Sequence, residues 1–219
     1  AAEQTNEALH RLEVERQGRQ TAFESTGQSS ARLEAQRAQF ETRRGELETL
    51  LARDRTPETY RARLELRPGA FPDSVSFEPA SLDAGLICRV LHFLKGPEIE
   101  RSARALFNWL APGGKVFAVA ETPYLSTFKK FIPIYEARKA AGKPWPGFVE
   151  DVLAMTPPER ATQLPPWIHF LDQDVLRRVF VAAGFVIERS EALARPDFPD
   201  IVQLDGRESV GLIARKQNS

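Results

Sequence analysis

Residues 82–125, LDAGLICRVLHFLKGPEIERSARALFNWLAPGGKVFAVAETPYL, carry the clearest structural signal in the chain. Residues 82–88 are mostly apolar and predict a strand that is buried on both faces. Pro97 is typical of a first helical turn, and the apolar residues after it recur at helical spacings. The turn Pro112-Gly113-Gly114 ends this helix, and residues 115–120 predict a second buried strand. A strand, a helix and a strand in this order indicate a parallel pair joined by a right-handed crossover.

Residues 122–170 interrupt this α/β rhythm because they are rich in proline and aromatic residues. We expect two short helices here, at about residues 127–140 and 147–155. Pro133 falls inside the first of them, so that helix should be kinked or split. The whole stretch is interpreted as a helical, aromatic-rich insertion or lid.

The end of the chain returns to a regular pattern. Asp172 predicts the N-cap of an amphipathic helix that ends at Gly184. Residues 185–188 and 209–214 then predict two strands with no helix between them. Such a pair indicates an antiparallel hairpin at the edge of the sheet.

The N-terminal part has a different composition. Residues 1–60 are dominated by Glu, Arg, Gln, Ala and Leu, which favour helix over strand. Leu33, Phe40 and Leu47 recur at heptad spacing, but the stripe is thin and must pack on the rest of the chain or on a second copy. We therefore expect a helical hairpin or coiled-coil-like segment over residues 1–56 and an α/β domain over residues 57–219. Residues 62–67 alternate between apolar and polar and predict a further strand.

The composition excludes several classes of protein. The 219 residues are 42% hydrophobic and carry a formal net charge of zero, which gives no sign of a nucleic-acid or anionic membrane partner. No apolar run approaches the roughly 20 residues that span a bilayer. The lone Cys88 excludes an intrachain disulfide framework and a cysteine zinc cluster, and no other set of metal ligands stands out. We expect a cytoplasmic protein.

The α/β part resembles class I S-adenosylmethionine-dependent methyltransferases over residues 62–216. Residues 110–114 match the family's Leu-Xaa-Pro-Gly-Gly turn before its fifth strand, and Ala183-Gly184-Phe185 match the entry to its next strand. Asp83 stands where the family often has an acid that opens its fourth strand. The resemblance implies an α/β fold with an incomplete Rossmann-like, mostly parallel sheet that ends in an antiparallel strand. It also implies S-adenosylmethionine as cofactor and methyl transfer by in-line attack between two positioned reactants.

The sequence departs from the family where the cofactor binds. In the family the first strand ends in a glycine-rich loop and the second in an acid that binds the ribose hydroxyls. Residues 1–61 offer neither, since Gly18, Gly27 and Gly45 are far apart in helical surroundings. At the third-strand site the family often has Gly-Asp-Phe, whereas this chain has an alanine before Phe71.

The resemblance implies that the cofactor lies beyond the carboxyl ends of the strands. Phe71, Arg89 and His92 are the candidate cofactor contacts. Phe71 would pack on an adenine ring, and Arg89 would meet a carboxylate of the ligand or pair with a nearby acid of the protein. His92 would contact the cofactor or the substrate, or play a structural part.

Candidate groups for the substrate follow the second predicted strand and end the insertion. Glu121 and His169 are the candidate catalytic bases; the alternatives are a loop acid without a role and a histidine that packs against Trp167. Tyr124, Tyr135 and Trp167 are candidate substrate-binding residues. These aromatics are equally suited to form the core of the insertion or a subunit contact.

Two functions fit these observations. The first is a methyltransferase-like protein that acts on a small, partly apolar metabolite and obtains its cofactor-binding half from elsewhere. The second is a non-catalytic relative that works as a binding or scaffold module. In that case the N-terminal helices cover the exposed edge of the sheet, since a bare strand edge promotes aggregation, and a homodimer forms through those helices or through that edge.

Overall fold

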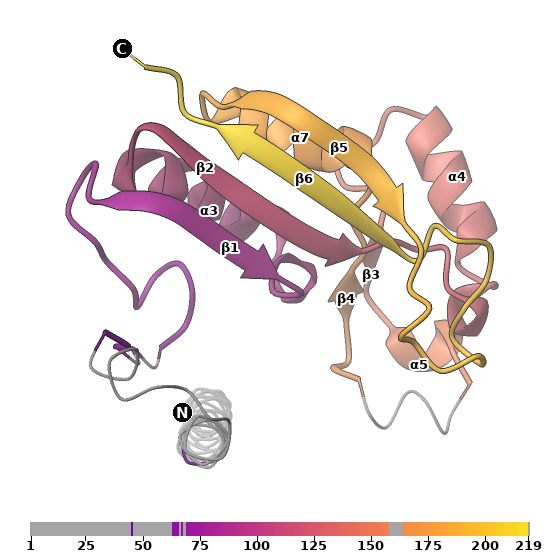
Figure 1. Ribbon diagram of the computed structural model, residues 1–219. Coiled ribbons are helices and arrows are strands. Elements are labelled where there is room, and N and C mark those ends of the chain that lie inside the picture. The colour runs from indigo at the N-terminus through magenta and orange to yellow at the C-terminus, as the bar shows by residue number, and fades with distance from the viewer. Residues whose placement is uncertain (1–44, 46–62, 66, 68, 158–163, 219) are drawn as a thin grey trace, which may run out of the picture. The chain divides into compact units, whose positions relative to one another are not determined.

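The structure is a computed structural model that describes residues 45, 63–65, 67, 69–157 and 164–218. The chain divides into two compact units, residues 1–68 and 69–219. The expected helical segment at residues 1–56 lies outside the described residues, except for Gly45, which is helical. The expected strand at residues 62–67 is wrong where it is described, because Leu64 and Glu65 have irregular, exposed backbone. The second unit carries the regular fold (Figure 1).

A four-stranded mixed sheet forms the centre of the second unit. Its strands are β1 (Leu82–Cys88), β2 (Leu110–Glu121), β5 (Val186–Leu193) and β6 (Ser209–Arg215). The order across the sheet is β1-β2-β6-β5. β1 and β2 are parallel, and β6 is antiparallel to both β2 and β5. The structure confirms the α/β class, the antiparallel terminal strand and the β5–β6 hairpin at the sheet edge.

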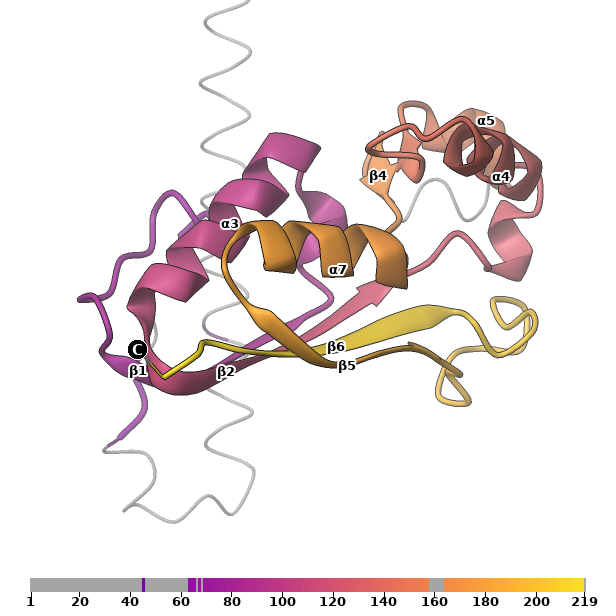
Figure 2. The same cartoon turned by 90° about the horizontal axis from the view of Figure 1, so that it is seen from above.

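Two amphipathic helices cover one face of this sheet, as Figure 2 shows from above. Helix α3 (Gly96–Trp109) begins with Pro97 in its first turn. Helix α7 (Gln173–Ala182) begins at Asp172, whose carboxylate accepts a hydrogen bond from the Val175 amide. Their apolar faces pack on the sheet and form the main hydrophobic core, which includes Ile87, Ile99, Leu106, Val116, Leu176, Val179, Phe180 and Leu212.

The opposite face of the sheet carries no helix among the described residues. Leu86, Phe117 and Ile213 are paired across β1, β2 and β6 and form an apolar row on this open face. Leu86 is 72% exposed and Phe117 is 39% exposed. The expectation that residues 82–88 are buried on both faces is therefore wrong, and Cys88 is exposed rather than packed inside. Strand periodicity reports which residues share a face but not whether another layer covers it.

The insertion forms its own small core beyond the carboxyl end of β2. It consists of η2 (Ser126–Phe128), α4 (Ile132–Ala140), β3 (Phe148–Val149), α5 (Val152–Met155) and β4 (Ile168–His169). Pro133 lies in the first turn of α4, so the expected first helix is split there. The expected second helix is replaced at its start by β3, which pairs with β4. Several aromatics of the insertion form this core, namely Phe128, Phe131, Tyr135 and Phe170.

Candidate functional site

The carboxyl ends of β1 and β2 bring Arg89, Glu121 and His92 together. Arg89 follows β1 with a positive φ of 59°, and its amide donates to the Val119 carbonyl at 2.8 Å. This backbone conformation turns its guanidinium toward Glu121, the last residue of β2. The Arg89 Nη2 and Glu121 Oε1 atoms are 2.7 Å apart, an ion pair without hydrogen-bond alignment. His92, in η1 (Leu91–Phe93), has its Nε2 atom 3.7 Å from Glu121 Oε2.

Burial decides the charge state of this cluster. His92 is 2% exposed, and desolvation lowers its pKa although the negative charge of Glu121 acts in the opposite direction. The imidazole is therefore neutral at pH 7. The charge of Glu121 is balanced by Arg89 instead, so this carboxylate is already paired before any ligand arrives.

A second arginine, which the sequence did not suggest, lies at the same edge. The guanidinium groups of Arg89 and Arg195 stand 5.2 Å and 4.2 Å from the centre of the Phe198 ring. Arg195 also donates to Asp197 at 2.6 Å. No local pattern in the sequence distinguishes Arg195 from other surface arginines, because its position depends on how the loop after β5 folds back.

Phe71 is not part of this cluster. Its ring contacts Trp109 edge-on, with centroids 6.4 Å apart. Trp109 is the last residue of α3 and directly precedes β2, so Phe71 lies at the amino end of the strands. Arg89 and His92 follow the carboxyl end of β1. The structure thus separates the three candidate cofactor contacts into two places.

Tyr124 and Tyr135 meet in a small polar pocket of about 150 Å³. Their rings are 5.8 Å apart and perpendicular. The Tyr135 hydroxyl donates to Asp172, which also accepts from Lys139 Nζ at 2.6 Å. Burial opposes ionisation of Asp172, but the bonds from Lys139, Tyr135 and the Val175 amide lower its pKa overall. Burial, aided by a hydrogen bond to Glu136, raises the pKa of Tyr124 to about 12.

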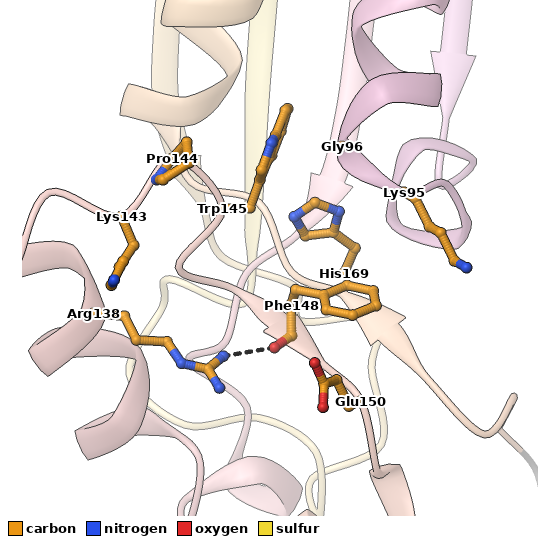
Figure 3. A pocket seen from close by; sticks show the side chains of 9 residues that line it. All are labelled: Lys95, Gly96, Arg138, Lys143, Pro144, Trp145, Phe148, Glu150 and His169. Carbon is orange, nitrogen blue, oxygen red and sulfur yellow. Dashed lines mark hydrogen bonds between the residues drawn. The ribbon is translucent and has the colours of Figure 1, made fainter.

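A larger cavity of about 390 Å³ lies between the start of α3, helix α4 and strand β4 (Figure 3). We call it the aromatic–cationic cavity. Its lining consists of Lys95, Gly96, Arg138, Lys143, Pro144, Trp145, Phe148, Glu150 and His169.

His169 is the most deeply buried of these lining groups, at 1% exposure. Its Nδ1 atom lies 3.1 Å from the Leu94 carbonyl oxygen, which can only accept, so we assign the proton to Nδ1. The Nε2 atom is buried and has no hydrogen-bond partner among the described residues. The ring stands between Trp145 and Phe148, at centroid distances of 5.1 Å and 5.4 Å.

Trp167 lies next to this cavity and apart from the tyrosine pocket. Its ring contacts Phe148 at 5.7 Å, and Lys95 Nζ is 5.8 Å from its centre. The candidate bases Glu121 and His169 are likewise in different surroundings, the first in the arginine cluster and the second in the cavity wall. The cations of the cavity were missed by sequence reasoning. Residues 143–146 did contain a signal for part of the cavity. Pro144 and Pro146 cannot continue a helix, so Trp145 must lie on a loop beside Lys143.

The burial of His169 predicts a pH dependence of stability. Desolvation lowers its pKa from 6.5 to about 4, so the unfolded chain binds a proton more readily than the folded protein. The stabilisation is present above pH 6.5 and is lost as the pH falls from 6.5 to 4, by up to about 3 kcal/mol. Urea unfolding at pH 7.5 and 4.5 measures this loss. The variant His169→Gln keeps a donor for Leu94 but does not titrate, and an equal loss in that variant would exclude His169 as its source.

Neither a family model nor a curated protein matches this sequence. Solved structures show a likeness of fold. An S-adenosylmethionine-dependent methyltransferase from Methanosarcina mazei is 18% identical with a TM-score of 0.45, and the match covers 67% of this chain and 64% of that protein. One from Mesorhizobium loti is 19% identical with a TM-score of 0.44, over 71% of this chain and 73% of its own. A possible histamine N-methyltransferase from Thermotoga maritima is 17% identical with a TM-score of 0.43, over 75% and 70%.

This chain matches less than two thirds of the length of the Methanosarcina protein. Residues 110–114, expected as a turn, are the start of β2, where a register shift interrupts the pairing with β1, and Gly184, with a φ of 104°, separates α7 from β5. No helix in the described part of the chain is long and apolar enough to cross a membrane. Among the same residues, no group of His, Cys, Asp and Glu could hold a metal ion.

Proposed function

We propose that this chain is a methyltransferase-like protein that takes a small, partly apolar molecule at the carboxyl end of its sheet. The observation that carries this proposal is the aromatic–cationic cavity, whose 390 Å³ lies within the range of about 300–1,000 Å³ that is usual for small-molecule sites. Its wall includes Lys95 and Gly96, which come shortly after the end of β1. Open α/β sheets bind ligands in this position, beyond the carboxyl ends of the strands.

The described residues do not fit S-adenosylmethionine, the cofactor that the resemblance implies. The family places an acid for the ribose hydroxyls after its second strand, and the described strands, which match the family from its fourth strand onward, include no counterpart of it. Phe71, the candidate adenine contact, lies at the opposite end of the strands. Methyl transfer would therefore need cofactor contacts from outside the described residues, and no step of the reaction is assigned to this chain.

Calorimetric titration of S-adenosylmethionine into the purified chain tests whether this chain binds the cofactor by itself. We expect no binding up to millimolar concentrations, because the ribose and adenine contacts are missing or misplaced. S-adenosylhomocysteine is the matched control, since it shares every contact except the methyl group and its charge. Micromolar binding of either compound would contradict the poor fit and assign independent cofactor binding to this chain.

A second candidate function is a non-catalytic binding or scaffold module that works as a homodimer. The row of Leu86, Phe117 and Ile213 on the open face favours it, because exposed apolar patches rimmed by polar residues mark protein contacts. β1 is also the terminal strand of the sheet, and unpaired strand edges add further strands readily.

Size exclusion with light scattering tests the dimer. We expect about twice the chain mass of 24.6 kDa and a shift toward monomer in the variant Leu86→Lys. Ile201→Lys is the matched control, because Ile201 is equally exposed but lies in a loop. A monomeric wild-type chain at high concentration would remove the dimer, and an equal effect of both variants would remove the open face as its interface.

A further inference from the structure

We propose that the aromatic–cationic cavity binds a planar aromatic carboxylate that also carries a hydroxyl or amine donor. The inference rests on the proposed function in one respect, namely that the cavity holds a small molecule, and it defines the chemical class of that molecule. Cations at the rim, aromatic walls and a buried acceptor each point to a different part of the ligand.

The rim of the cavity has an excess of positive charge. Lys95, Arg138 and Lys143 line it against the single carboxylate of Glu150. Within the described part of the chain, none of these three cations forms an ion pair with a carboxylate. Arg138 donates through Nη1 to the Phe148 carbonyl at 2.7 Å, which holds the guanidinium on the wall and leaves its other N–H groups for a ligand (Figure 3).

The start of α3 adds to this positive potential. Gly96 is the first residue of this 14-residue helix and lines the cavity. A helix N-terminus carries a partial positive charge, which Glu98 in this first turn partly offsets, and the amides of Glu98 and Ile99 already donate to the Lys95 carbonyl. An anionic group of the ligand therefore belongs at the rim, between Lys95 and Lys143.

The walls favour a flat ligand. Trp145, Phe148 and His169 present three rings to the cavity, and aromatic rings pack best against other rings, stacked or edge-on. The indole of Trp145 is seated directly on Gly96, where an added Cβ would come within 2.3 Å of it. Arg178 stands 4.7 Å from the indole centre. The close packing on Gly96 and the contact with Arg178 fix the indole ring of Trp145 as one wall of the cavity.

His169 defines the second polar group of the ligand. Its Nδ1 proton is committed to Leu94, and burial keeps the ring neutral, so Nε2 is an acceptor that lacks a donor. A buried polar atom without a partner is destabilising, and a ligand O–H or N–H would supply the missing hydrogen bond. Nε2 faces the side of the ring on which Trp145 lies (Figure 3), so a ligand donor would approach it beside the indole.

Three naphthalene probes separate these requirements in calorimetric titrations of the full chain at pH 7.5. The probe 6-hydroxy-2-naphthoate has the anion and the donor, 2-naphthoate lacks the donor, and 6-hydroxy-2-naphthalenemethanol lacks the anion. We expect the hydroxy acid to bind about tenfold more tightly than either of the others, since a hydrogen bond that involves a charged or buried group contributes about 1.5 kcal/mol. Equal binding of all three probes, or no binding of the hydroxy acid, would overturn the inference.

Variants assign each preference to a side chain. His169→Phe keeps a ring but removes the acceptor, so the preference for the hydroxy acid over 2-naphthoate should disappear. Lys143→Gln should reduce the preference for the acid over the alcohol, and Lys129→Gln, at an exposed lysine outside the cavity, should not. If His169→Phe fails to fold, the ¹⁵N signal of His169 Nε2 in the wild-type protein serves instead. That signal should move when the hydroxy acid binds and stay when 2-naphthoate binds, and the opposite pattern would exclude the acceptor role.

The probes contain no part of S-adenosylmethionine, so the two proposals fail separately. Binding of the hydroxy acid without the cofactor supports the ligand class and leaves methyl transfer to an assembly. Binding of the cofactor without the hydroxy acid overturns the ligand class only.

Discussion

Replacement of Asp172 by alanine should lower the free energy of unfolding by about 3 kcal/mol, with the lost helix cap and the stranded Tyr135 hydroxyl as its main sources. Asp172 is 6% exposed and joins two elements of the unit. One carboxylate oxygen caps α7 through the Val175 amide, and the other accepts from Tyr135 and Lys139 of α4. Alanine removes the cap and leaves a buried hydroxyl without a partner.

Urea unfolding at pH 7 measures this loss, with Asp172→Asn as the matched control. Asparagine keeps an acceptor for the cap but removes the charge that Lys139 pairs with, so its cost should be clearly smaller. Because the pKa of Asp172 is lowered in the folded protein, its ionic contribution is present above the unfolded value near 4 and is lost as the pH falls further. The difference in stability between the alanine and wild-type proteins should therefore narrow as the pH falls below about 4. A cost below about 1 kcal/mol at pH 7 would show that α4 and α7 are not joined through this carboxylate.

Replacement of Gly147 by alanine should destabilise the insertion by about 2–4 kcal/mol and close the aromatic–cationic cavity to ligands. An added Cβ would lie 2.0 Å from the Phe170 carbonyl oxygen, and this neighbour is backbone, which cannot rotate away. The same residues are held together by a hydrogen bond from the Phe170 amide to the Gly147 carbonyl at 2.9 Å. Relief of the clash must therefore move Gly147 away from Phe170, and the residues next to them, Phe148 and His169, both line the cavity.

Gly142→Ala provides a matched control for Gly147→Ala. Gly142 has a φ of 68° and open space around it, so alanine there meets only the cost of a left-handed backbone, about 1 kcal/mol. Thermal unfolding and binding of 6-hydroxy-2-naphthoate measure both variants. Similar losses at the two positions would mean that the close approach at Gly147 does not support the cavity.

The sequence predicted those elements whose signal is local. The strands β1, β2, β5 and β6 and the helices α3 and α7 each have the right periodicity and clear punctuation, such as Pro97, Asp172 and Gly184. The sequence did not predict β3 and β4, because each has two residues, which are too few to show an alternation of apolar and polar side chains. The sequence also did not predict the exposure of Leu86. Whether a strand residue is buried depends on a layer packed against that face of the sheet, which strand periodicity does not report.

The site was predictable only in its parts. Arg89, His92 and Glu121 follow two adjacent parallel strands, so their meeting follows from topology. Lys95, Arg138 and Lys143 come from separate segments, and only the fold of the insertion brings them around His169. The proton assignment of His169 depends on the Leu94 carbonyl, a contact across most of the unit that no spacing in the sequence reveals.

The position of β1 at the end of the sheet has a further consequence for how this polypeptide can be used. Among the described strands β1 pairs only with β2, through a parallel ladder, so the peptide groups on its other side are open to a further parallel strand. A separately expressed strand–helix peptide could complete that ladder, as a fragment does in a split reporter. A strand added there would extend the sheet on the side of β1 and would lie next to Leu86.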